Sequence, residues 1–474
     1  MSTPTPGRRI AARARRRPDA AVLAGAALVV LALVLLVVVD RVEAEPEAPP
    51  RASAVPVGEV TAACAASPVP GRREVSTLAA ALPDAEGEGR LVAGAAGEEP
   101  TQIRGARGER VDVDLPARAA DAAVTVAATG AQALGRVTFQ VDRARGGERL
   151  AVQACPQPRS RWWFTGAGAG LDHTSVLTLV NLDPGPAVVD VLALGADGPI
   201  DSVGTRGITI GPGEVHTLDL VDVAPQADEL AVHVEASRGR VVAVMADGLT
   251  EGPAGAAGQE WLPGQSRPAR ELRLAPLPRR ADRRTLLVAN PGDREALVEV
   301  ALAGEAGTFV PTGVGPVRVP PGTVVTQDLG DAVGAEPTAV VLRSTVAVTA
   351  AVRSVSGGGD HAYAAVVRPL RRPAAAVLPV AGAAVHLTAG EDGGTARVTS
   401  YSAAGEEVAT EDVEVPAAST VTWQPGRDAA SVLVTPVIGR LWGGVALTGD
   451  GLSQIALREL PVTLRRPPVV PVVR

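Results

Sequence analysis

The hydrophobic pattern of the chain begins with one uninterrupted apolar run and then changes to short alternating segments. Residues 20–39 carry no charged side chain and consist mainly of Val, Leu and Ala. At about 1.5 Å per helical residue, such a run is roughly 30 Å long, which matches the hydrocarbon thickness of a bilayer. The sequence therefore predicts a single transmembrane helix over residues 20–39.

Charges on the two sides of this run predict its orientation. Arginines precede it and acidic residues follow it, so the positive-inside rule places residues 1–19 in the cytoplasm and the bulk of the chain outside the cell membrane. A cleaved signal peptide is the alternative, because Val42-Glu43-Ala44 weakly resembles a cleavage site. The apolar run exceeds the roughly 7 to 15 residues of a signal peptide, however, which favours an uncleaved single-pass anchor.

Beyond the run, apolar and polar positions alternate with a period of two. Residues 40–57 are acidic and proline-rich, which favours an extended stalk. In stretches such as 110–115 and 135–141 apolar and polar residues alternate, as they do in half-buried strands, and Gly and Pro residues interrupt the pattern. The sequence predicts a first β domain over residues 58–160.

An internal repeat organises the rest of the chain. Landmark residues recur after 109 positions, as Asn181 and Asn290, Gly213 and Gly322, and Asp219 and Asp328. Apolar runs around them correspond as well, and a weaker third copy follows. The predicted boundaries are 161–270, 271–372 and 373–464 for the three repeats and 465–474 for a proline-rich tail.

Each repeat has the length and turn spacing of an antiparallel β-sandwich. The predicted fold class is thus all-β, with tandem antiparallel β-sandwich domains after one N-terminal transmembrane helix. Recurring turn elements support it, because Asn satisfies its own backbone, Pro presets φ and Gly accepts a positive φ. These elements are Asn181, Pro184 and Gly185 in the first repeat and Asn290, Pro291 and Gly292 in the second.

The chain has only two cysteines, Cys64 and Cys155, both on the predicted external side. Oxidising conditions there allow a disulfide to persist, so we expect the two to pair and close the first β domain. Reactive thiols or a metal site would need a CxxC motif or nearby histidines, and the sequence has neither.

The balance of charges and the absence of catalytic motifs in the sequence exclude several classes of function. There are 45 basic residues, all Arg, against 52 acidic ones, a balance that excludes most nucleic-acid binding. The five histidines are dispersed and no metal-binding or GxSxG motif occurs, so we expect no metal, no cofactor and no enzymatic activity. A hydrolase with carboxyls assembled across domains is left open.

Two groups of residues are candidates for a site. Asp172-His173-Thr174-Ser175 contains the residue types of a nucleophilic triad, but neighbours in a strand point to opposite faces, so a turn or strand-entry role is favoured. Trp162, Trp163 and Phe164 could stack on sugars if exposed; the favoured interpretation is that they pack between the first β domain and the first repeat. Trp261 is expected to fill the junction with the second repeat.

The stretch Trp162-Trp163-Phe164-Thr165-Gly166-Ala167-Gly168 and the segment 172–181 resemble a known family. Residues 228–234, 260–263 and 288–292 match it too. The chain is similar to actinobacterial, membrane-anchored envelope proteins known only as the DUF5719 family. The resemblance implies cell-surface polysaccharide biology by association and carries over no activity or catalytic residue.

The sequence thus predicts a non-catalytic, membrane-anchored, extracytoplasmic scaffold or interaction protein of the cell envelope. Its partners would be the membrane itself and other envelope proteins. A polysaccharide-binding accessory to envelope glycan synthesis or export, with cell-wall polysaccharide as the ligand, is the alternative. An unrecognised hydrolase is the third hypothesis.

Overall fold

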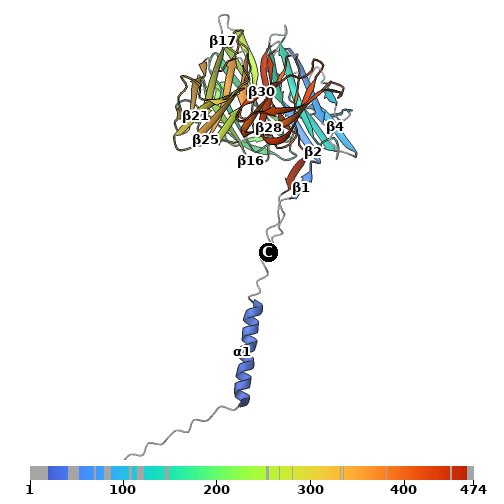
Figure 1. The fold of residues 1–474 in the computed structure, drawn as a ribbon, viewed down its shortest axis with the longest axis vertical. Coiled ribbons are helices and arrows are strands. Elements are labelled where there is room, and N and C mark those ends of the chain that lie inside the picture. Colours follow the sequence, from blue (N-terminus) through green and yellow to red (C-terminus); the bar gives the residue numbers. More distant parts are fainter. Residues whose placement is uncertain are drawn as a thin grey trace, which may run out of the picture. The chain divides into compact units, whose positions relative to one another are not determined.

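The computed structural model of the chain is built almost entirely from β-strands (Figure 1). Its described helices are α1 (Ala20–Asp40) and the short α2 (Leu220–Val223). This content confirms the all-β class predicted from the alternating segments. The residues that the structure describes are 20–40, 53–68, 71–79, 87–105, 109–114, 122–144, 149–251, 256–265, 267–279, 281–330, 333–334, 336–380, 382–448 and 451–466.

α1 contains the apolar run of the sequence. Among the residues that the structure describes, no helix combines the length and the hydropathy that a membrane crossing requires. The transmembrane segment stays a prediction. The expected cytoplasmic tail at 1–19 and most of the expected stalk, 41–52, lie outside the described residues.

The two ends of the described β region pair with each other. β1 (Ser53–Pro56) and β34 (Thr463–Arg466) form a two-stranded sheet. Residues 53–56 of the expected stalk and the start of the expected tail are therefore strands. The reason is that each strand satisfies backbone N–H and C=O groups of the other.

The strands of the compact body Pro56–Leu464 fall into four consecutive modules. The first module contains β2 (Glu59–Cys64), β3 (Gly71–Ala79), β4 (Gly89–Ala95), β5 (Thr101–Gln102), β6 (Arg110–Asp112), β7 (Val124–Gly130), β8 (Arg136–Ala144) and β9 (Leu150–Ala154). The second contains β10 (Arg161–Ala167), β11 (His173–Val180), β12 (Ala187–Leu194), β13 (Pro199–Ile200), β14 (Ile208–Ile210), β15 (Val215–Asp219), β16 (Leu230–Arg238), β17 (Val242–Glu251) and β18 (Ala256–Leu262).

The other two modules follow the same plan. The third contains β19 (Ala269–Leu274), β20 (Arg283–Ala289), β21 (Ala296–Gly304), β22 (Gly307–Phe309), β23 (Val317–Val319), β24 (Val324–Asp328), β25 (Ala339–Val355) and β26 (His361–Ala365). The fourth contains β27 (Ala374–Val377), β28 (Ala384–Tyr401), β29 (Glu407–Val415), β30 (Thr420–Trp423), β31 (Ser431–Thr448), β32 (Leu452–Ala456) and β33 (Arg458–Glu459).

Every module has an axial sheet and a companion sheet, both antiparallel. The axial sheets are β6-β3-β8-β9, β15-β11-β17-β18, β24-β20-β25-β26 and β30-β28-β31-β32. The companion sheets centre on β2-β7-β4, β10-β16-β12, β19-β25-β21 and β27-β31-β28. The first module thus shares the topology of the three repeats, although it lacks their landmark residues.

The repeat is visible in strand register. β11 pairs with β15 so that Val180 faces Val215, and β20 pairs with β24 so that Ala289 faces Val324, the same pairing 109 residues later. In the third module β25 runs through both sheets. In the second module the matching segment is divided into β16 and β17 at Gly239, whose φ of +72° favours glycine.

The modules form a propeller-like ring around an axis. The last strands of the axial sheets contact one another in a closed circle, β9 with β18, β18 with β26, β26 with β32, and β32 with β9. The second and third modules each have a hydrophobic cluster between their two sheets. The fourth module's cluster extends to Phe139 and Val152 of the first module, so the two ends of the body share one core.

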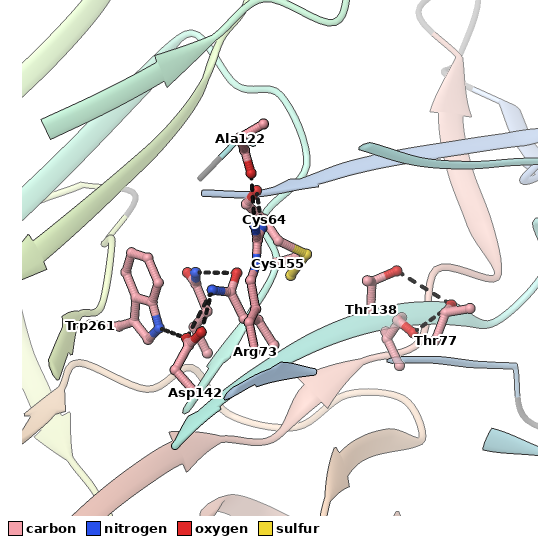
Figure 2. Close-up of a disulfide and its surroundings, with 11 residues drawn as sticks. Cys64, Arg73, Thr77, Ala122, Thr138, Asp142, Cys155 and Trp261 are labelled. Carbon is pink, nitrogen blue, oxygen red and sulfur yellow. Dashed lines mark hydrogen bonds between the residues drawn. A yellow bond between two sulfur atoms is a disulfide. The ribbon is translucent and has the colours of Figure 1, made fainter. Parts of the chain in front are cut away.

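The predicted disulfide is present. Cys64 at the end of β2 and Cys155 just after β9 are bonded, with Cα atoms 4.8 Å apart (Figure 2). The bond joins the companion sheet of the first module to its axial sheet, and both cysteines are buried.

Candidate functional site

The predicted turn asparagines lie fully buried at the ends of β11 and β20. The Asn181 amide donates to the carbonyls of Gly185 (2.8 Å) and Ile210 (2.9 Å). Asn290 makes the matching pair of bonds, and its Oδ1 accepts the N–H of Gly292. Each asparagine closes its turn and ties it to a neighbouring strand.

The aromatic residues of β10 are buried and form no exposed patch. Trp162, Trp163 and Phe164 are at most 6% exposed. Because successive strand residues point to opposite faces, Trp162 and Phe164 face the core of the second module, whereas Trp163 points the other way. Trp163 stacks on His233, with ring centroids 4.2 Å apart, and packs against Ala289 of the third module.

Trp261 of β18 lies at the junction with the first module. Its indole Nε1 donates to Asp142 Oδ2 of β8 at 2.9 Å (Figure 2). Asp142 also accepts from Gln140. The contact arises because the closed ring brings β18 next to β9, an arrangement that sequence order alone does not reveal.

A fully buried carboxylate, Asp247 of β17, collects side chains from two modules. Its Oδ1 accepts from Ser175 Oγ (2.5 Å) and lies 3.0 Å from His173 Nε2. Its Oδ2 accepts from the Tyr363 hydroxyl (2.8 Å) and lies 3.2 Å from His361 Nε2. We call these five residues the Asp247 hub.

Hydrogen-bond chemistry fixes the charges of the hub. His173 Nδ1 lies 2.7 Å from the carbonyl oxygen of Asp228, and Nε2 faces the Asp247 carboxylate, so both ring nitrogens face acceptors and both carry protons. Burial opposes the charged imidazole, but Asp247 raises the pKa of His173 above its usual value. Burial would likewise raise the pKa of Asp247, yet His173 and His361 hold it well below its usual range.

An ion pair extends the hub between modules. Arg353 of β25 donates through both terminal nitrogens to the Glu229 carboxylate, beside β16. Burial of Tyr363, followed by the charge of Asp247, raises the pKa of its hydroxyl well above the usual value, so the phenol keeps its proton. The second and third modules are thus joined by a buried, charged network.

The hub does not have the arrangement of a nucleophilic triad. In such a triad the imidazole lies between the hydroxyl and the acid. Here the Ser175 hydroxyl donates its hydrogen bond directly to Asp247 and accepts one from the N–H of Gly168, and the imidazole of His173 bonds the same carboxylate. The sequence did contain a signal for the proximity of these two side chains, because His173 and Ser175 are two residues apart on one strand and share a face. Their shared partner, Asp247, lies 72 residues after Ser175.

Three further buried carboxyls lie near the axis. Burial raises the pKa of Asp142 and of Asp360 to about 6, and that of Glu260 well above its usual value. Asp360 Oδ2 accepts the N–H of Leu452, and Glu260 Oε1 accepts that of Trp261. Across the described residues, no group of three or more His, Cys, Asp or Glu side chains could hold a metal ion.

A cavity of about 120 Å³ lies on the axis at the carboxyl ends of β9, β18, β26 and β32. Rings of Trp162, Phe164, Trp261 and Tyr363 line it, together with Arg458. A larger groove of about 550 Å³ follows the third module's companion sheet. Its lining includes Arg273, Glu299, Phe309, Val310 and Arg343.

One family matches more than half of the chain. The profile described as "Family of unknown function (DUF5719)" aligns with residues 112–426. No curated protein matches the chain significantly.

Solved structures give only weak similarities. An α-L-rhamnosidase of Streptomyces avermitilis, complexed with L-rhamnose, is 13% identical over 85% of this chain, with a TM-score of 0.12; the match spans 55% of the enzyme chain, about half its length. The BSP domain of a biofilm associated protein is 10% identical over 87% of this chain and 99% of that domain, with a TM-score of 0.14. At these TM-scores neither similarity bears on function.

Proposed function

Because the chain belongs to the DUF5719 family, whose function is unknown, we propose a function from its own geometry: it is a non-catalytic, membrane-anchored scaffold or interaction protein of the cell envelope. The Asp247 hub is the observation that carries this proposal. Side chains of catalytic type, an acid, two imidazoles and two hydroxyls, bond one another inside the body and link the second module to the third. Because these side chains hold two modules together, they support a role of the body as a rigid platform.

Sequence and disulfide together support an external position for the body. The arginines before residue 20 and the apolar run after them orient a membrane anchor with the body outside. The bond between Cys64 and Cys155 suits an oxidising compartment. The proposed partners are other envelope proteins.

Crosslinking in intact cells tests the scaffold. A tagged full-length chain is crosslinked, recovered from membranes, and compared with a tagged control that retains only residues 1–52. We expect envelope proteins that the full chain captures and the control does not. Equal recovery by both, together with unchanged envelope composition and assembly after gene deletion, would contradict the proposal.

The groove on the third module favours a second function, binding of envelope polysaccharide. The Phe309 ring is 47% exposed and Val310 is 71% exposed, and Arg273, Glu299 and Arg343 line the same groove. An exposed ring beside charged hydrogen-bonding groups can stack on one face of a sugar and bind its hydroxyls.

Retention on purified cell-wall glycans tests this second function. We expect Phe309→Ala to reduce retention several-fold. Leu171→Ala is the matched control, because Leu171 is equally apolar and 99% exposed but lies on the second module. Equal retention of the native chain and Phe309→Ala would remove the groove as the glycan site. Trp163 is unsuitable for this test, since its ring is buried at a module junction.

A further inference from the structure

The axial cavity has one wall from every module. Residues at the carboxyl ends of the four axial strands line it, and several of them, including Ala154, Pro263, Val366 and Ala456, are half-buried. The cavity therefore reaches solvent at this end of the axis. The buried carboxyl of Asp360 lies toward the other end, because Asp360 precedes β26 and accepts the N–H of Leu452 at the start of β32.

Arginines gather at the open end. Arg458 lines the cavity, and the guanidinium carbon of Arg159 stands 4.8 Å from the centroid of the Trp162 ring, which also lines it. Arg368 follows β26 at the same end. Burial, followed by the charges of Arg458 and Arg368, lowers the pKa of Arg159 to about 10. Burial and then Arg368 likewise lower the pKa of Arg458.

Among the residues that the structure describes, no carboxylate balances the charge of Arg159 or of Arg458. Within the described residues neither guanidinium forms an ion pair, and the charges that act on the two are those of other arginines. Elsewhere in the body a buried arginine such as Arg353 is paired with an acid. Unpaired, partly desolvated arginines that repel one another are stabilised by an anion placed between them.

A buried side-chain amide, that of Gln454, also lines this cavity. Gln454 of β32 is only 5% exposed, and in the described part of the chain neither its Nε2 nor its Oε1 has a hydrogen-bond partner. An unpaired buried amide is costly, so a ligand that offers both an acceptor and a donor would be favoured there. The aromatic lining adds apolar faces on which a ring can lie.

We propose that the axial cavity is a binding site for a small, ring-shaped anion, whose carboxylate or phosphate meets Arg159 and Arg458 while its hydroxyls bond Gln454 and its ring contacts the aromatic lining. A volume of about 120 Å³ accepts one such group. The site is separate from the groove on the third module and goes beyond the scaffold function, which does not require it.

Titration calorimetry of the purified full-length chain tests the site with three probes. Glucuronate presents a carboxylate, glucose 1-phosphate a phosphate, and glucose neither. We expect at least one of the two anions to bind at least tenfold more tightly than glucose, with an affinity that falls as salt is raised. Which anion binds more tightly distinguishes the carboxylate from the phosphate. Equal binding of all three probes, or no binding of either anion at millimolar concentration, would overturn the proposal.

Variants locate the binding. Arg458→Gln removes one of the repelling charges, so it should fold, and we expect it to weaken anion binding at least tenfold. Gln454→Leu removes the amide without changing charge and should weaken binding several-fold. Arg206→Gln is the matched control, because its guanidinium is exposed and pairs with Asp201 on the second module. Native affinity in both cavity variants would place the anion elsewhere and refute the site.

Discussion

The charged carboxylate of Asp247 can be buried only because four side chains bond to it. Taking a carboxylate out of water costs several kcal/mol, and here the imidazolium of His173 and three further donors offset that cost. The arrangement makes the hub sensitive to loss of any charged member, since a partner left behind would be buried and unpaired.

Substitution of the central carboxyl measures this dependence. Asp247→Asn leaves the imidazolium of His173 without its counter-charge, and we expect the free energy of unfolding to fall by about 3 to 5 kcal/mol. Denaturant unfolding of the full chain measures it. Asp201→Asn, at an exposed pair with Arg206, should change stability by less than about 1 kcal/mol. A similar small loss at Asp247 would show that the hub contributes little.

The pKa of Asp360 is shifted in the opposite direction to that of Asp247. Burial raises its pKa from 3.8 to about 6, so the folded chain holds this proton more tightly than the unfolded chain. The native state therefore loses stability as pH rises from about 4 to about 6, and the loss is complete above that range.

A neutral side chain removes this cost. Asp360→Asn can keep the oxygen that accepts the Leu452 N–H. We expect it to raise the free energy of unfolding by about 3 kcal/mol at pH 8 and by roughly half as much at pH 5. Unfolding curves at the two pH values test this, and a gain that is equal or larger at pH 5 would contradict the assignment.

At the scale of elements, the disulfide joins the strands at which the first module begins and ends. Cys64 closes β2 and Cys155 follows β9, 91 residues later. β9 also belongs to the axial circle, so the bond fixes one wall of the axial cavity to the companion sheet of its module.

Removal of this bond should be costly because it releases a long loop. For the double variant Cys64→Ser with Cys155→Ser we expect the free energy of unfolding to fall by about 2 to 5 kcal/mol. A reductant should bring the native chain to the same value and leave the variant unchanged. A native chain indifferent to the reductant would show that the bond does not stabilise the body.

At the scale of the whole molecule, ring closure couples all four modules. The first and fourth share one hydrophobic cluster, the Asp247 hub and the Arg353–Glu229 pair join the second and third, and Trp261 with Asp142 joins the first and second. Trp442 lies in the small cluster between the third and fourth. No module can leave the ring without exposing apolar surface and breaking a buried polar contact.

This coupling predicts cooperative unfolding. Calorimetry of the full chain should show one main heat transition for the body, because separation of any module destabilises its neighbours. Arg353→Met should shift that single transition to lower temperature by several degrees without splitting it. Two or more separated transitions in the native chain would contradict a coupled ring.

The sequence by itself determined the local features of this protein. Alternation of Val, Leu and Ala sets the strands, the landmarks from Asn181 and Asn290 onward set a common register, and two cysteines can form only one intramolecular bond. These features depend on neighbours in the chain or on a spacing that can be counted.

Only the tertiary structure decided which distant residues meet. Closure of the ring brought β32 next to β9, gathered Ser175, Asp247 and Tyr363 in one hub, and brought Arg159 under the influence of the charge of Arg458, which lines the axial cavity. It also buried Trp163, which the sequence alone allowed to be exposed. The physical reason is that periodicity assigns a side chain to a face of its strand, while the partner of that face is chosen by how whole sheets pack.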